Sequence, residues 1–234
     1  QLRLAERFGW RSVLWTGWLG TPIHELSHAF MCRVFQHRVD EIALFEPDRQ
    51  SGRLGFVRHS FQTGNWFQEL GNFFIGIAPP IGGPGVLVAL LWLFYPNAID
   101  GAYAVAQSSE AAPLQQLGQI MTVVVKEIFT GANVATGRFW LFVYFVLCVG
   151  GHMAPSPSDY EGASRGVYFL GGGVLVVVFG LAATGTDTNS MIDGMIGLLG
   201  PLFAVLALAI VLCGIATAIV WLITSIFPKR FEVR

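Results

Sequence analysis

The chain has 234 residues, of which 53% are hydrophobic and only 12% are charged, and its formal net charge is −1. Because ordinary soluble domains carry about 25% charged residues, this composition excludes a typical soluble domain as the main body of the chain. The near-neutral charge also excludes a broad basic surface, so we expect no nucleic-acid partner.

Five stretches of the chain are apolar enough to cross a lipid bilayer, which takes about 20 residues of helix. They cover residues 8–35, 73–95, 139–154, 167–183 and 198–227. We therefore expect an all-α polytopic membrane protein with about five transmembrane helices. Residues 1–165 would form its core, and residues 166–234 would add two C-terminal transmembrane helices.

Two more polar connections separate the first three predicted spans. The first contains VDEIALF and RLGFVRHSF on either side of the turn-rich EPDRQSG, a pattern that predicts a small β-hairpin. The second connection predicts one amphipathic helix near residues 114–129. Lys and Arg are more numerous on the side that holds the hairpin loop and the C-terminus, which predicts that both are cytoplasmic.

Residues 24–28 read HELSH and lie inside the first predicted span. On a helix, His24 and His28 share one face one turn apart, so both imidazoles can bind one zinc ion. In such a pattern Glu25 is the general base that activates the zinc-bound water. Ionisable residues inside a membrane span are costly, which favours a functional role over helix packing. Thr and Pro at positions 21 and 22 predict a break there, with a new helix starting at the motif.

A catalytic zinc ion usually has three protein ligands and a water. Our first candidate for the third ligand is Asp159, which follows the two prolines that end the third span. His152 is the main alternative, and the lesser ones are Glu46, Asp48 and Glu161. Asn72, where the second span begins, is a weaker candidate for binding the substrate backbone or the oxyanion, with helix capping as the alternative.

These features together resemble the site-2 protease family of intramembrane zinc metalloproteases. The resemblance rests on HELSH, the hairpin after it, GNFFIGIAPPIGG, and PSPSD, which is similar to the family pattern N-x-x-P-x-P-x-x-D-G. Asp159 matches the aspartate of that pattern, which is the third zinc ligand of the family. The chain departs from the pattern in three respects: its spacing is one residue shorter, His152 stands in the region of the asparagine, and YEG follows the aspartate. No PDZ domain is recognisable, which indicates a divergent, PDZ-less member.

The resemblance implies an intramembrane zinc metalloendopeptidase that cleaves membrane-spanning or membrane-associated proteins. Zinc would be held by His24, His28 and Asp159, and the bacterial inner membrane would be its location. The alternative is a non-proteolytic, protease-like component that holds other membrane subunits in a larger assembly. Glu25 favours hydrolysis, because a purely structural zinc site needs no base.

Overall fold

The computed structural model describes residues 10–108, 113–156, 159–161 and 163, together with a few isolated positions further along the chain. This part is mostly helical and contains one two-stranded antiparallel hairpin. The predicted combination of helices with a hairpin between the first two of them is therefore confirmed. Apart from those isolated positions, the two helices predicted within residues 166–234 lie outside the described residues.

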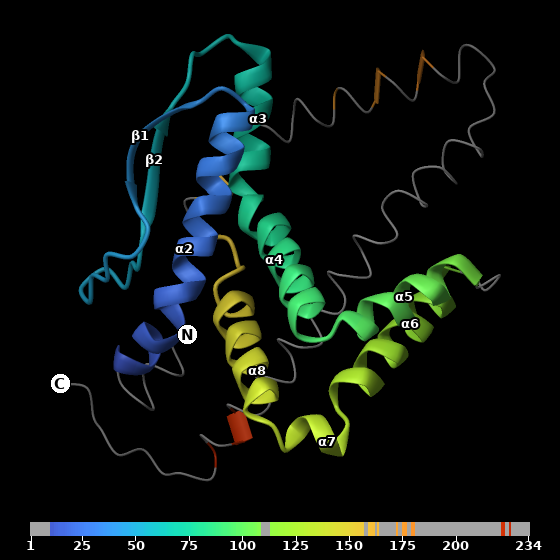
Figure 1. Cartoon of the computed structure of the whole chain (residues 1–234). Coiled ribbons are helices and arrows are strands. Elements are labelled where there is room, and N and C mark those ends of the chain that lie inside the picture. The colour runs from blue at the N-terminus through green and yellow to red at the C-terminus, as the bar shows by residue number, and fades with distance from the viewer. Residues whose placement is uncertain are drawn as a thin grey trace.

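The described elements follow one another along the chain as shown in Figure 1. They are α2 (Trp10–Val34), β1 (Arg38–Ala43), β2 (Phe56–Ser60), α3 (Trp66–Gly76), α4 (Ala78–Phe94), α5 (Pro96–Ser108), α6 (Pro113–Ile128), α7 (Gly131–Val134) and α8 (Gly137–Gly150). Helix α2 packs against α3, α4 and α8, and the hairpin lies along its other side.

Helix α2 carries the HELSH motif and continues through Pro22 without interruption, so the predicted break at residues 20–22 is wrong. Pro22 removes one backbone N–H and therefore one helical hydrogen bond. Close packing on the N-terminal side of the proline compensates for this loss. A Cβ at Gly20 would overlap the carbonyl of Cys148 on α8, and one at Gly17 would lie 2.9 Å from the side chain of Leu54. Tertiary contacts therefore hold α2 in one piece.

The second predicted span consists of two helices, α3 and α4, which meet at Ile77 and are bent by 56°. Pro79 and Pro80 explain the bend, because proline suits the first turn of a helix but cannot continue the preceding one. By length and hydropathy, this bent pair could cross a membrane. Across the part of the chain that the structure describes, no single helix is both long and apolar enough to do so. Helix α8 is apolar but has only 14 residues.

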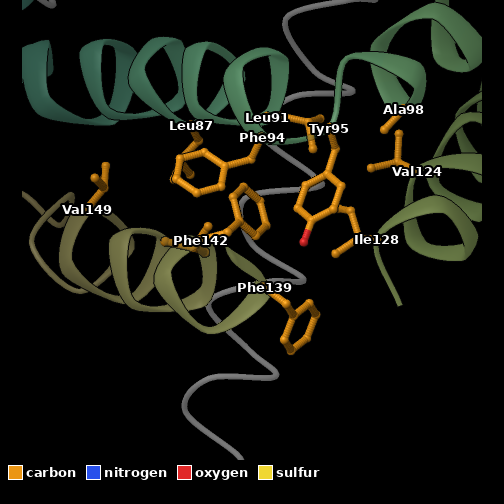
Figure 2. Packing of buried hydrophobic residues seen from close by; sticks show 11 residues of the cluster. Leu87, Leu91, Phe94, Tyr95, Ala98, Val124, Ile128, Phe139, Phe142 and Val149 are labelled. Carbon is orange, nitrogen blue, oxygen red and sulfur yellow. The ribbon is translucent and has the colours of Figure 1, made fainter. Parts of the chain in front are cut away.

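The amphipathic helix predicted near residues 114–129 is confirmed as α6, and it pairs with α5, which the sequence pattern did not predict. The two helices meet where Gly101 faces Val123, since a Cβ at this glycine would lie 2.7 Å from the valine side chain. A hydrophobic core joins α4, α5, α6 and α8 (Figure 2). Its buried members are Leu87, Leu91, Phe94, Tyr95, Ala98, Val124, Ile128, Phe139, Phe142, Val146 and Val149.

The hairpin is held at its base by α3. Strands β1 and β2 pair from Arg38 opposite Ser60 to Ala43 opposite Phe56, with a bulge between Val39 and Glu41. On α3, the side-chain amide of Gln68 donates to the carbonyl of residue 36 at 2.9 Å, and its oxygen accepts from the N–H of residue 62 at 2.6 Å. One glutamine therefore fixes both ends of the hairpin beside α2.

Candidate metal centre

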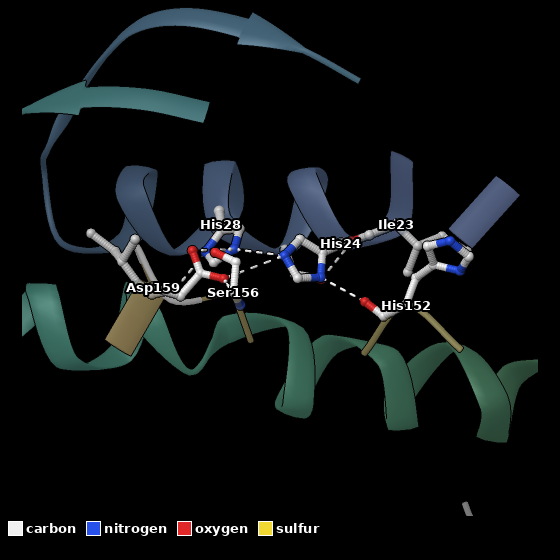
Figure 3. Close-up of polar contacts among 8 residues, drawn as sticks. Ile23, His24, His28, His152, Ser156 and Asp159 are labelled. Atoms are coloured by element: carbon white, nitrogen blue, oxygen red, sulfur yellow. Dashed lines mark hydrogen bonds and ion pairs between the residues drawn. The ribbon is translucent and has the colours of Figure 1, made fainter. Parts of the chain in front are cut away.

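His24, His28 and Asp159 come together in the described structure as a group that could hold a metal ion (Figure 3). The two Nε2 atoms are 3.1 Å apart. Asp159 Oδ2 lies 3.6 Å from His24 Nε2, and Asp159 Oδ1 lies 3.3 Å from His28 Nε2. A tetrahedral zinc ion with ligand bonds of about 2.0–2.1 Å would separate its donor atoms by about 3.3 Å. Each of these three contacts is close to that separation, and the two histidines approach different oxygens of the carboxylate.

Backbone carbonyls orient both imidazoles of this group. His24 Nδ1 lies 2.6 Å from the carbonyl oxygen of His152, and His28 Nδ1 lies 2.7 Å from that of Ile75. A carbonyl can only accept, so each Nδ1 carries the hydrogen and each Nε2 presents its lone pair to the centre. Hydrogen bonds of this kind are typical of histidines that bind metals, because they fix the tautomer and the ring orientation.

Asp159 reaches the two histidines through the loop that follows α8. The backbone N–H of Ser156 donates to Asp159 Oδ2 at 2.6 Å and so holds the carboxylate in place. The loop passes close to Gly76 at the end of α3, where a Cβ would overlap the carbonyl of Asp159. The bend between α3 and α4 thus lies where the aspartate approaches α2.

His152, the main alternative third ligand, contributes its carbonyl and not its ring to the centre. Its Nδ1 donates to the carbonyl of Cys148 at 2.9 Å, and its ring packs against Gly20 on α2. Of the lesser candidates, Asp48 accepts hydrogen bonds within the hairpin turn, from the N–H of Gln50 and the hydroxyl of Ser51. Among the described residues, Asp159 is thus the candidate third ligand whose side chain groups with His24 and His28.

Glu25 lies beside the three grouped side chains and is only 7% exposed. It lines a cavity of about 1380 Å³ together with them. The walls of this cavity come from α2, the hairpin, α3 and the loop after α8. A buried carboxylate next to a potential metal site, in a cavity that can admit a ligand, has the position that a general base requires.

Asn72 also lines this cavity and is only 4% exposed. Its side-chain Nδ2 has no hydrogen-bond partner in the described structure. The capping alternative for Asn72 is wrong, because the residue that caps α3 is Asn65, whose side chain accepts from the N–H groups of Phe67 and Gln68. The amide of Asn72 is therefore a free donor next to the candidate centre.

A second histidine pair, His37 and His59, was missed at the sequence level. Their Nδ1 atoms are 3.0 Å apart, and His37 Nε2 donates to the carbonyl of Gln68 at 2.8 Å. Burial lowers the pKa of both imidazoles, so the neutral forms are favoured. The two residues are 22 positions apart, and only the register of the hairpin brings them together.

Comparison of the chain with models of protein families, with curated proteins and with solved structures finds no match. The resemblance to the site-2 proteases therefore rests on the motif residues alone.

Proposed function

We propose that the protein is an intramembrane zinc metalloendopeptidase that hydrolyses peptide bonds of membrane-spanning or membrane-associated proteins. The observation that carries this proposal is the arrangement of His24, His28 and Asp159, whose potential ligand atoms all lie within 4.8 Å of one another, with the buried Glu25 beside them. Three protein ligands leave one position open, which is the arrangement of catalytic rather than structural zinc sites.

The donor set of two imidazoles and one carboxylate suits zinc. Bound zinc would lower the pKa of a water molecule and polarise the carbonyl of the substrate. In this scheme Glu25 accepts the proton of the attacking water and delivers it to the nitrogen of the leaving amine. Asn72 donates a hydrogen bond from its free Nδ2 to the oxygen on which negative charge develops.

A membrane location is part of the proposal. The bent pair α3–α4 has the length and hydropathy of a broken span. Helix α2 has 25 residues, long enough to cross a hydrocarbon core of about 30 Å, but it is less apolar than a single span requires. Large apolar side chains on α2, α4 and α8 face outward, as expected beside lipid: Trp15, Trp18, Phe30, Trp92, Leu93, Trp140 and Leu141. We further propose about five spans, with the hairpin and the C-terminus on the cytoplasmic side of a bacterial inner membrane.

The Glu25→Gln variant tests this function. The full chain is purified in detergent, zinc is measured by mass spectrometry, and cleavage is followed by immunoblot after coexpression with tagged single-span membrane proteins. We expect the wild type to bind about one zinc and to cleave a substrate, and Glu25→Gln to keep the zinc and lose cleavage. A wild type that binds no zinc would contradict the proposal. Zinc binding with equal, background cleavage by both proteins would favour the alternative of a non-proteolytic membrane component.

A further inference from the structure

Three of the residues that line the cavity at the candidate metal centre each carry a buried polar atom without a hydrogen-bond partner in the described structure. These atoms are Thr21 Oγ1 on α2, Asn72 Nδ2 on α3 and His152 Nε2 after α8, and each residue is more than nine-tenths buried. The other such atom in the described residues, the hydroxyl of Tyr95, belongs to the hydrophobic core and does not line the cavity. Because buried polar groups without partners are rare and destabilising, three in one cavity indicate a polar ligand.

Thr21 stands out among the three, because a helical threonine usually satisfies its own hydroxyl. Thr16, five residues earlier on α2, donates to the carbonyl of Val13 at 3.3 Å. An acceptor for the hydroxyl of Thr21 exists in the same helix. The carbonyl of Trp18, three residues earlier, receives no hydrogen bond from Pro22, because proline has no N–H. The hydroxyl of Thr21 nevertheless donates to no described residue. Its hydroxyl is therefore a buried hydrogen-bonding group that the described residues leave without a partner.

The three residues are distributed along the metal pair, toward both of its ends. Thr21 lies one helical turn before Glu25 and therefore before His24 and His28 on α2. The ring of His152 packs on Gly20, and Figure 3 shows His152 on the His24 side of the metal pair. Asn72 lies one turn before Ile75, whose carbonyl holds His28 at the other end. From residue 21 to residue 28 the helix rises roughly 10 Å, which is the length of about three extended residues.

The chemistry of the three atoms is also that of a backbone partner. Thr21 and Asn72 offer donors, which suit the carbonyls of a peptide. His152 Nδ1 donates to the carbonyl of Cys148, so its Nε2 is an acceptor and suits a peptide N–H. Donors and acceptors alternate along an extended chain, so one segment can satisfy all three.

We propose that Thr21 and His152 form a subsite that binds the backbone of an extended peptide segment of the substrate. This subsite lies on the opposite side of the metal pair from Asn72. This inference rests on the proposed protease function and adds two substrate-binding residues to it. Sequence reasoning gave Thr21 only a capping role and His152 only a role as metal ligand.

Two hydroxamates test the subsite on the zinc-loaded full chain in detergent. Acetohydroxamate binds through the metal alone, whereas an N-blocked tri-leucine hydroxamate adds a peptide backbone. We expect Thr21→Val to weaken the tri-leucine hydroxamate about threefold to tenfold, the effect of one lost hydrogen bond, and to leave acetohydroxamate unchanged. His152→Phe, which keeps the backbone carbonyl that orients His24, should show the same pattern.

Matched variants separate ligand binding from folding. Thr21→Ser keeps the hydroxyl and should bind as the wild type does, and Thr16→Val removes a hydroxyl that is already satisfied within α2 and should also bind normally. The thermal midpoint of the metal-free Thr21→Val protein should not fall, because the lost hydroxyl has no partner. Equal affinity of Thr21→Val and wild type for the tri-leucine hydroxamate would overturn the subsite. Failure of the zinc-loaded wild type to bind acetohydroxamate would instead overturn the proposed function.

Discussion

Gly55, in the segment that leads into β2, lies directly against the side chain of Glu25 on α2. A Cβ at position 55 would lie 3.0 Å from Glu25 Cγ and 2.8 Å from the methyl carbon of Thr21. On the other side it would lie 2.7 Å from the carbonyl oxygen of Ala43 in β1. The hairpin therefore forms a wall of the cavity and needs a glycine where it meets the proposed base.

A methyl group at this point should separate the hairpin from α2. We expect Gly55→Ala to lower the free energy of unfolding by about 1–3 kcal/mol, because overpacking forces backbone shifts, and to reduce cleavage while zinc remains bound. Gly118→Ala on α6 is the control, since a Cβ there meets nothing within 4 Å and alanine favours the helix. Thermal unfolding and the cleavage assay report both effects. Wild-type cleavage by a folded Gly55→Ala protein would show that this contact does not shape the site.

Removal of the carboxylate that meets the histidine pair should abolish the metal site. We expect Asp159→Ala to weaken zinc binding by more than about 100-fold, because even partners of metal ligands contribute about 10–100-fold. His152→Ala should keep zinc binding close to that of the wild type, because the carbonyl that orients His24 remains. Competition with a zinc chelator measures both affinities. If the His152 variant lost zinc and the Asp159 variant kept it, the ligand set would be wrong.

Sequence reasoning reached the parts of the site that depend on local pattern. The spacing of His24 and His28 sets their common helix face, the turn residues predicted the hairpin, and the resemblance pointed to Asp159. It failed where distant segments decide the outcome. Helix α2 stays continuous at Pro22 because α8 and the hairpin pack beside it.

Other features of the site also depend on tertiary contacts. The capping alternative for Asn72 could be dismissed only when Asn65 proved to cap α3. The missing partner of Thr21 can be recognised only after all neighbouring donors and acceptors are placed. The residues that line a cavity and leave a polar atom unpaired carry no local signature in the sequence.

The free amide of Asn72 should matter to the chemical step and not to stability. We expect Asn72→Leu to lower kcat by about 100-fold or more, as the loss of an oxyanion donor does elsewhere, with zinc content unchanged. Its thermal midpoint should not fall, because the removed Nδ2 has no partner. Asn65→Ala is the matched control: it should lower stability by about 1 kcal/mol through loss of the α3 cap and leave kcat unchanged. A normal kcat for Asn72→Leu would remove this residue from the mechanism.

The His37–His59 pair should make the attachment of the hairpin sensitive to pH. Burial lowers the pKa of both imidazoles, and the charges of His37 and then of His28 lower the pKa of His59 further. In the opposite direction, the carbonyl of Gln68 and the carboxylate of Glu69 raise the pKa of His37, and Asp40 raises that of His59. The folded chain then binds fewer protons than the unfolded chain. The stability from the neutral pair is fully present above the unfolded-state pKa of about 6.5. It is lost as the pH falls from there through the lower folded-state pKa.

Thermal unfolding of the metal-free protein between pH 8 and pH 5.5 measures this effect. We expect the midpoint to fall with pH in the wild type. In His59→Phe the midpoint should be lower at pH 8, because the bond between the two Nδ1 atoms is gone, and it should fall less toward pH 5.5, because one titrating group is absent. The difference between the two curves isolates the pair from the other histidines. Parallel curves would mean that protonation of His59 does not govern how the hairpin is held.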